Sequence, residues 1–153
     1  MKLVLAGIGR MRSRELAAVR AEYLKRMQRY AAVEVLEIKE EKGAGRGARG
    51  REAARVCKGL RDGDFLVVCD ERGRQLSSRQ LAGFLAERDR SGPGRTVCLV
   101  GGPYGVSDEL RERADRLLAL SRLTLPHELA QVVLTEALYR AMTITRGEKY
   151  HHE

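Results

Sequence analysis

The sequence lacks several features that would mark a common class of protein. It has no tryptophan and only 5% aromatic residues, so a base-stacking platform of the RRM type is not expected. No apolar run approaches the ~18 residues that a membrane helix needs, and the apolar start, residues 1–7, is too short for a signal peptide. Three cysteines without a close pair argue against a disulfide framework or a CxxC zinc site, and three histidines nominate no metal site. We therefore expect a cytoplasmic protein without a membrane segment or a metal.

Short catalytic motifs of common enzymes are also missing. No GxxxxGK[ST] sequence occurs, so a P-loop nucleotide site is excluded, and neither GxSxG nor HExxH is present. The pair Gly7-Ile8-Gly9 lacks the third glycine of a dinucleotide-binding fingerprint. The usual hydrolase and kinase interpretations therefore find no support.

Positive charge is what the sequence has in excess. The chain has 153 residues, which predicts a single domain over 1–153, and its formal net charge is +8. Residues 42–61 contain seven basic side chains and one acidic side chain, so seven minus one, or +6, of the net charge lies in this segment. Within them the run 43–50 resembles an arginine–glycine RNA-binding segment, and a flexible solvated loop is the alternative. This balance suits a polyanionic partner such as a nucleic acid.

Short apolar runs alternate with helical patterns along the chain. Helices are expected from Ser13 to about 30, over 51–60, from Ser77 or Ser78 to about 90, from Ser107 to about 118, and from Pro126 to about 145. Strands are expected at 2–6, 33–38, 65–69 and 96–100, with a short extended run at 123–125. This alternation predicts an α/β fold with a mostly parallel sheet and flanking helices.

In such sheets ligands bind beyond the carboxyl ends of the strands. Three segments leave the expected strands there, at 70–73, 101–105 and 121–127. The glycines of Gly101-Gly102-Pro103-Tyr104-Gly105 expose backbone that a side chain would cover, although an ordinary tight turn is the alternative. The segment 123–127 offers backbone groups for an adenine edge, and a plain loop before a helix is its alternative.

A set of short segments spread over the chain is more specific than any one of these motifs. They are Met1-Lys2-Leu3, Glu22-Tyr23, Lys25-Arg26, Val35-Leu36-Glu37-Ile38, Gly101-Gly102-Pro103-Tyr104-Gly105, Ser121-Arg122-Leu123-Thr124-Leu125-Pro126-His127, Val132-Val133-Leu134, Glu136-Ala137-Leu138-Tyr139-Arg140-Ala141 and Tyr150-His151. With them the chain resembles, over nearly its whole length, the bacterial 23S rRNA pseudouridine N3-methyltransferase family of the SPOUT superfamily. The basic segment 42–61 is the least similar part.

The resemblance implies a homodimeric α/β fold with a C-terminal trefoil knot, which nothing in the periodicity indicates. It also implies S-adenosylmethionine as the methyl donor. The positions that match the cofactor pocket of the family are Cys69, Gly102, Ser121, Arg122, Leu123, Thr124, Leu125 and Pro126. Cys69 stands where related sequences often have leucine. Tyr104 stands where some have glutamate, so no catalytic carboxylate is assigned there.

The implied reaction is methyl transfer to N3 of a pseudouridine in 23S rRNA of the assembled 70S ribosome. N3 is a weak acid and must lose its proton as it attacks, so a base or a cationic group would help. By analogy the C-terminal tail folds over the cofactor pocket, and the pocket of the partner subunit is an alternative to that of its own chain. The catalytic candidates are His151, Tyr150 and Arg140, with Glu136 orienting Arg140. Tyr150, His151 and solvent stay alternatives as the proton acceptor.

Two other functions remain open from the sequence. One is a non-enzymatic RNA-binding ribosome factor, in which the knot is only a scaffold. The other is a SPOUT methyltransferase with a different RNA target.

Overall fold

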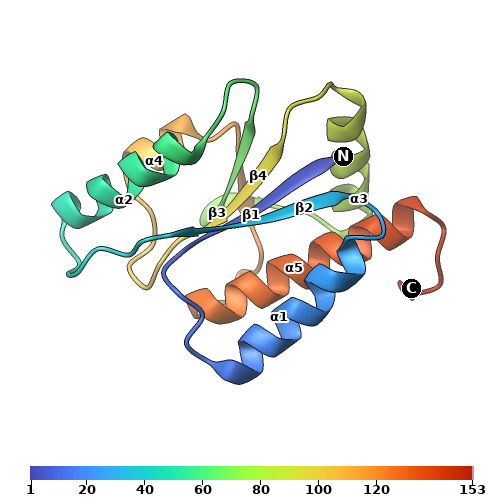
Figure 1. The fold of residues 1–153 in the computed structure, drawn as a ribbon, viewed down its shortest axis with the longest axis horizontal. Coiled ribbons are helices and arrows are strands. Elements are labelled where there is room, and N and C mark those ends of the chain that lie inside the picture. The colour runs from blue at the N-terminus through green and yellow to red at the C-terminus, as the bar shows by residue number, and fades with distance from the viewer. Residues whose placement is uncertain (153) are drawn as a thin grey trace.

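The computed structural model describes residues 1–152 as five strands and five helices in alternation (Figure 1). In chain order they are β1 (Lys2–Ile8), α1 (Arg14–Met27), β2 (Ala32–Ile38), α2 (Arg46–Gly59), β3 (Phe65–Gln75), α3 (Ser78–Arg90), β4 (Thr96–Val100), α4 (Asp108–Arg113), β5 (Arg116–Ala119) and α5 (His127–Thr145). Within the described residues no helix is both long enough and apolar enough to cross a membrane.

All five strands form one parallel sheet in the order β2-β1-β4-β3-β5. The predicted α/β class with a mostly parallel sheet and flanking helices is therefore confirmed. Parallel neighbours require crossover connections, and the alternating helices supply them. The trefoil knot implied by the resemblance stays a prediction.

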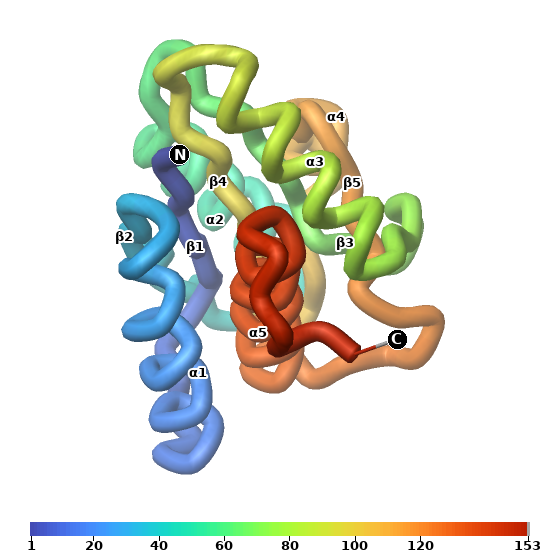
Figure 2. Tube along the Cα trace, turned by 90° about the vertical axis from the view of Figure 1, so that its right-hand side faces the viewer, coloured from blue at the N-terminus to red at the C-terminus, as the bar shows by residue number. Residues whose placement is uncertain are grey.

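Helices cover both faces of the sheet, and the pleat of the strands divides the core between them. On β1, Leu3 and Leu5 belong to the cluster that includes residues of α3 and α5, whereas Val4, Ala6 and Ile8 belong to the cluster of α2 and α4. This alternation follows from the two-residue period of a strand. Figure 2 shows α1, α5 and α3 next to one another, with α5 in the middle. Because both faces are buried, the middle parts of the central strands are apolar on both faces, at residues 3–6 of β1, 66–68 of β3 and 97–100 of β4.

Serine side chains fix the starts of three helices as the sequence predicts. Ser13, Ser77 and Ser107 each accept a hydrogen bond from a backbone N–H in the first turn of α1, α3 and α4. The side-chain oxygen of Gln80 in turn accepts a hydrogen bond from the backbone N–H of Ser77, which completes a capping box. A carboxylate from α5 adds to the start of α1, where Glu128 accepts from the backbone N–H groups of Arg12 and Ser13.

The end of α4 and the position of β5 differ from the prediction. The helix expected from Ser107 to about 118 ends at Arg113, and the chain then forms β5, whereas 123–125 is not a strand. Asp115 makes the difference, because its N–H donates to the carbonyl of Leu66 and its carboxylate accepts from the N–H of Leu66. The spacing of Leu117 and Leu118 fits either a helix or a strand, and they form a strand because they pair with Val68 and Cys69 of β3.

The basic segment also differs from the prediction. α2 begins at Arg46, inside the run 43–50 that the sequence indicates as a loop, rather than near residue 51. Ala48, Ala53 and Val56 are buried against the sheet, and the buried side chains of Arg49 and Glu52 form an ion pair at 2.7 Å. Burial of this face outweighs the low helix propensity of the glycines at 47 and 50.

The strand β3 is longer than expected and contains a bulge. Its register to β5 shifts between Cys69 and Arg74, so that residues 70–73 lie outside the regular pairing. Glycine at position 73 lets the strand return to β5, because the Cβ of any other residue would lie 2.6 Å from the backbone of Leu117 and Leu118. A bulge of this kind re-aims side chains at the rim of a sheet.

Candidate functional site

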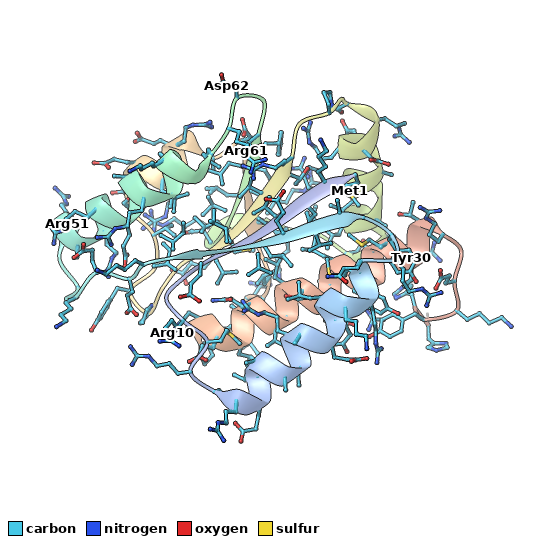
Figure 3. The ribbon with its side chains drawn as sticks, in the orientation of Figure 1. Met1, Arg10, Tyr30, Arg51, Arg61 and Asp62 are labelled. Atoms are coloured by element: carbon cyan, nitrogen blue, oxygen red, sulfur yellow. The ribbon has the colours of Figure 1, made fainter. Side chains whose placement is uncertain are left out.

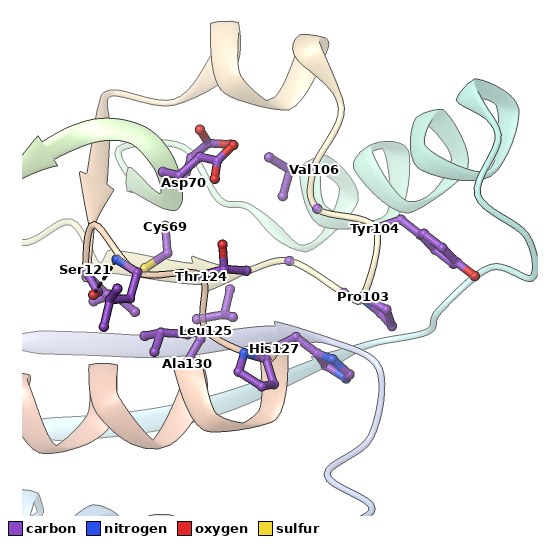
Figure 4. A pocket seen from close by; sticks show the side chains of 18 of the residues that line it. Cys69, Asp70, Pro103, Tyr104, Val106, Ser121, Thr124, Leu125, His127 and Ala130 are labelled. Carbon is purple, nitrogen blue, oxygen red and sulfur yellow. Dashed lines mark hydrogen bonds between the residues drawn. The ribbon is translucent and has the colours of Figure 1, made fainter.

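A cavity of about 730 Å³ lies at the bulge of β3 and at the ends of β4 and β5 (Figure 4). This volume falls within the usual range of small-molecule sites. The lining consists of residues 69–71, 100–106, 120–121 and 123–127, with Arg111 and Ala130 added from α4 and α5. These residues overlap the three segments that the sequence indicates, 70–73, 101–105 and 121–127. The topology places them together because parallel strands end at one edge.

Seven of the eight residues predicted for the cofactor pocket line this cavity. They are Cys69, Gly102, Ser121, Leu123, Thr124, Leu125 and Pro126. The eighth, Arg122, is exposed and does not belong to the lining. Burial raises the pKa of the Cys69 thiol far above its ordinary value, so this side chain presents a neutral wall. Their role in cofactor binding stays a prediction.

The glycine-rich loop after β4 is a tight turn. The N–H of Gly105 donates to the carbonyl of Gly102 at 3.0 Å, and Gly105 has a φ of +77°, which favours glycine. A Cβ at Gly101 would lie 2.8 Å from a methyl carbon of Val106. The segment is therefore a tight turn, and its glycines also present their backbone to the cavity, as the two interpretations from the sequence suggest.

The second backbone-rich wall precedes α5. Within the described residues, the backbone of 121–125 forms no hydrogen bond with another backbone group, although the N–H of Leu123 donates to Ser121 Oγ at 2.9 Å. Polar backbone groups of this kind need a partner, which is water or a ligand. They can bind the donor and acceptor edge of a heterocycle.

The sequence reasoning assigned no role to three charged residues that line the cavity, Asp70, Glu71 and Arg111. Arg111 Nε donates to Asp70 Oδ2 at 2.7 Å. The hydrogen bond to Asp70 raises the pKa of Arg111, which stays a cation. The signal for Asp70 was its place directly after a buried strand. Arg111 had no signal, because it depends on where α4 lies over the sheet.

The predicted catalytic residues form a cluster of their own at the C-terminal end of α5, hereafter the tail cluster (Glu136, Arg140, Tyr150, His151). Arg140 donates to Glu136, and its guanidinium carbon lies 4.8 Å from the centre of the Tyr150 ring. His151 Nδ1 lies 3.3 Å from Arg140 Nη1. The Tyr150 hydroxyl donates to Glu136 at 3.0 Å. The predicted orienting contact between Glu136 and Arg140 is thus present.

Electrostatics in the tail cluster keep Arg140 charged and Tyr150 neutral. The hydrogen bond to Glu136 raises the pKa of Arg140. Burial, together with hydrogen bonds to Tyr23 and Glu136, raises the pKa of Tyr150. At neutral pH this phenol therefore keeps its proton and acts as a donor.

The tail cluster and the cavity do not meet within one chain. No member of the tail cluster lines the cavity, which contacts α5 at His127 and Ala130. Arg140 follows Ala130, the nearer of these two contacts, by ten residues on the same helix, which is a separation of ~15 Å at 1.5 Å per residue. The structure thus brings together the cofactor candidates, and separately the catalytic candidates.

Basic residues lie on the same side of the molecule as the cavity. Figure 3 shows Arg51 on α2 and Arg10 on the loop between β1 and α1, both beyond the carboxyl ends of the strands. Lys42, Arg46 and Arg51 are exposed. One basic residue reaches the rim of the cavity, because the guanidinium of Arg49 lies 5.1 Å from the ring centre of Tyr104.

Comparison with known proteins identifies a family and close relatives. A family model described as "Predicted SPOUT methyltransferase" matches residues 1–151. A protein of Geobacter metallireducens named "Ribosomal RNA large subunit methyltransferase H" is 44% identical over 153 residues, covering 99% of both chains. Proteins with the same name from Syntrophotalea carbinolica and Geobacter sp. (strain M21) are 39% and 42% identical, covering 99% and 100% of both chains.

Proposed function

The chain belongs to the SPOUT methyltransferase family, and we propose that it transfers a methyl group from S-adenosylmethionine to large-subunit ribosomal RNA. The acceptor in this proposal is N3 of a pseudouridine of 23S rRNA in the assembled ribosome, which places the enzyme in the cytoplasm. The observation that carries the proposal is the cavity at the strand ends, whose walls are backbone-rich and follow the segments that resemble the family.

The cavity fits the methyl donor in size and chemistry. Backbone groups of 121–125 suit the adenine edge, and apolar walls from Val100, Leu125 and Ala130 suit its faces. When bound, S-adenosylmethionine supplies a methyl group activated by a sulfonium. The chain's own contribution is to bind the donor and align it with the acceptor nitrogen for in-line displacement.

The tail cluster suits the acceptor side of the reaction. Removing the N3 proton creates negative charge, and a fixed cation such as Arg140, held by Glu136, stabilises that charge. The raised pKa of Tyr150 argues against this phenol as the base and favours a role in holding Glu136. His151, next to Arg140, is then the better placed proton acceptor.

A homodimer is needed to combine the two halves of the site. Because ~15 Å of helix separates Arg140 from Ala130, the nearest α5 residue that lines the cavity of its own chain, we propose that the tail cluster of one subunit serves the cavity of its partner. A closed two-fold arrangement would then complete two equivalent sites.

The basic residues of α2 and of the loop before α1 suit the phosphates of the RNA. Binding of this kind positions the substrate and makes its affinity depend on salt. Replacing Arg10 or Arg46 by alanine should lower the slope of log affinity against log salt by about one for each phosphate that the protein no longer neutralises. An affinity for ribosomes that does not change with salt concentration would contradict phosphate binding by these residues.

Two measurements separate this function from its alternatives. Calorimetry with S-adenosylmethionine should give heat of binding, whereas a non-enzymatic RNA-binding factor would give none. Mass mapping of ribosomal RNA from a deletion strain should show one pseudouridine of 23S rRNA without its methyl group, restored by the wild-type gene. Loss of a methyl group from another RNA, with 23S rRNA unchanged, would reject the proposed target.

A further inference from the structure

Tyr104 is an exposed aromatic residue at the rim of the cavity that the mechanism above does not use. Its side chain is 58% exposed, although large apolar side chains are usually covered. The turn from Gly102 to Gly105 carries Pro103 and Tyr104 at its tip, so the ring is held out from the sheet. In Figure 4 it points away from the centre of the cavity, toward α2.

A buried arginine holds this ring in place. Arg49 is only 8% exposed, and its guanidinium lies 5.1 Å from the centre of the Tyr104 ring. The guanidinium is itself fixed by Glu52 at 2.7 Å and by a hydrogen bond to the carbonyl of Gly43 at 3.0 Å. Tyr104 therefore rests on a rigid cation, which gives the exposed ring a defined position at little entropic cost.

The position of Tyr104 connects the basic end of α2 to the cavity. Lys42 and Arg46 are exposed near the start of this helix, and within the described residues neither forms an ion pair with an acidic side chain. An RNA strand whose phosphates contact these residues would pass Tyr104 before a nucleotide enters the cavity. Because the ring points away from the cavity, it faces a base beside the acceptor rather than the acceptor itself.

We propose that Tyr104 stacks on an unpaired RNA base that flanks the methylated nucleotide, and that Arg49 is the positioning residue that holds its ring. This inference rests on the proposed function. A single aromatic side chain is sufficient for such a contact, since every base has a π-face. The contact fixes the register of the RNA strand and leaves binding of the methyl donor unaffected.

Substitutions at position 104 test the ring directly, because an exposed turn tolerates them. Tyr104→Leu keeps apolar area and removes the π-face, whereas Tyr104→Phe keeps the ring. With ribosomes as substrate, Tyr104→Leu should raise KM about ten-fold, the order expected when one base stack is removed, while Tyr104→Phe stays near wild type. For both variants kcat and the Kd for S-adenosylmethionine should be unchanged. A wild-type KM for Tyr104→Leu would overturn the inference, and so would a Tyr104→Phe variant as impaired as Tyr104→Leu.

The role of Arg49 is tested by combining variants. Arg49→Lys keeps the charge opposite Glu52 and loses the planar group, so it should raise KM in the wild-type background and have no further effect in the Tyr104→Leu background. Equal effects in both backgrounds would show that Arg49 acts independently of Tyr104. Urea unfolding of each variant shows whether the fold is retained.

The absence of tryptophan allows a direct measurement of stacking. Tyr104→Trp creates the only tryptophan of the chain, and a stem-loop RNA from 23S rRNA should quench its fluorescence in a saturable manner. Val19→Trp on the exposed side of α1 is the matched control and should not respond. Unquenched Tyr104→Trp with an RNA that demonstrably binds would refute the stacking contact. A wild-type enzyme that transfers no methyl group to ribosomes would instead refute the proposed function.

Discussion

Complementation between two inactive subunits tests whether the site is shared between chains. The first subunit lacks residues 150–153 and so loses Tyr150 and His151 but keeps its cavity. The second carries Thr124→Trp, which fills the cavity but leaves the tail intact, since Thr124 lines the cavity and the tail does not. Each homodimer is expected to be inactive. Sedimentation should show that both variants still dimerise.

The expected activity of the mixed dimer follows from the geometry. With ~15 Å of helix between Arg140 and Ala130, which lines the cavity of the same chain, a tail that serves the partner completes one of the two sites of a mixed dimer. Co-expressed subunits with different tags, purified through both tags, should therefore recover about half of the wild-type activity per dimer.

The assay is transfer of a labelled methyl group to ribosomes, with calorimetry to show that Thr124→Trp no longer binds S-adenosylmethionine. If the tail instead serves its own cavity, the mixed dimer contains no complete site. Complete inactivity of a folded mixed dimer, with cofactor bound to its intact cavity, would refute the shared site.

Three further predictions concern the scaffold around the site. Gly73→Ala should destabilise the protein by ~1–3 kcal/mol in urea unfolding and weaken cofactor binding, because its Cβ would displace β5. The control is Gly83→Ala in α3, where a Cβ meets no other atom, and it should stabilise the protein by ~0.5–1 kcal/mol. At pH 8 a maleimide should modify the exposed Cys57 and spare Cys98, whose pKa burial raises to about 12, and rapid modification of Cys98 in the folded protein would contradict the core. Backbone hydrogen bonds lower the pKa of Glu128, so its carboxylate stabilises the folded protein at neutral pH and loses this effect when it is protonated in acid. The difference in unfolding free energy between wild type and Glu128→Gln should therefore shrink as the pH falls through the range where carboxyl groups titrate. A difference that is constant with pH would reject this carboxylate as the cause.

Several parts of the fold could be predicted because their signals are local. The strand β4 has the predicted bounds, and α3 begins after Ser77 as its capping residues indicate. Two of the three cavity segments, 70–73 and 101–105, could be named because each follows a buried apolar run. The third, 121–127, was indicated by its own backbone groups and not by the strand before it, since β5 was predicted as part of a helix. Their meeting at one edge follows from the parallel sheet, which the alternation of elements predicts.

Other parts depended on partners far away in the sequence. The boundary between α4 and β5 is decided by Asp115, which pairs with Leu66 in β3. The glycine- and arginine-rich run is helical because one face of α2 packs on the sheet, where Ala48, Ala53 and Val56 are buried. Neither interaction leaves a trace in the local pattern, and burial outweighs local propensity.

For the site, the sequence by itself indicated the backbone-rich loops, and its resemblance to a family implied the cofactor-pocket residues and the catalytic candidates of the C-terminal segment. Folding in three dimensions was needed to establish that these two groups lie apart, with the cavity at the N-terminal end of α5 and the tail cluster farther along it, and that Tyr104 rests on Arg49 beside the cavity. The difference arises because loop composition and helix caps act over a few residues. Separation along a rigid helix and packing of one side chain on another are set by the completed fold.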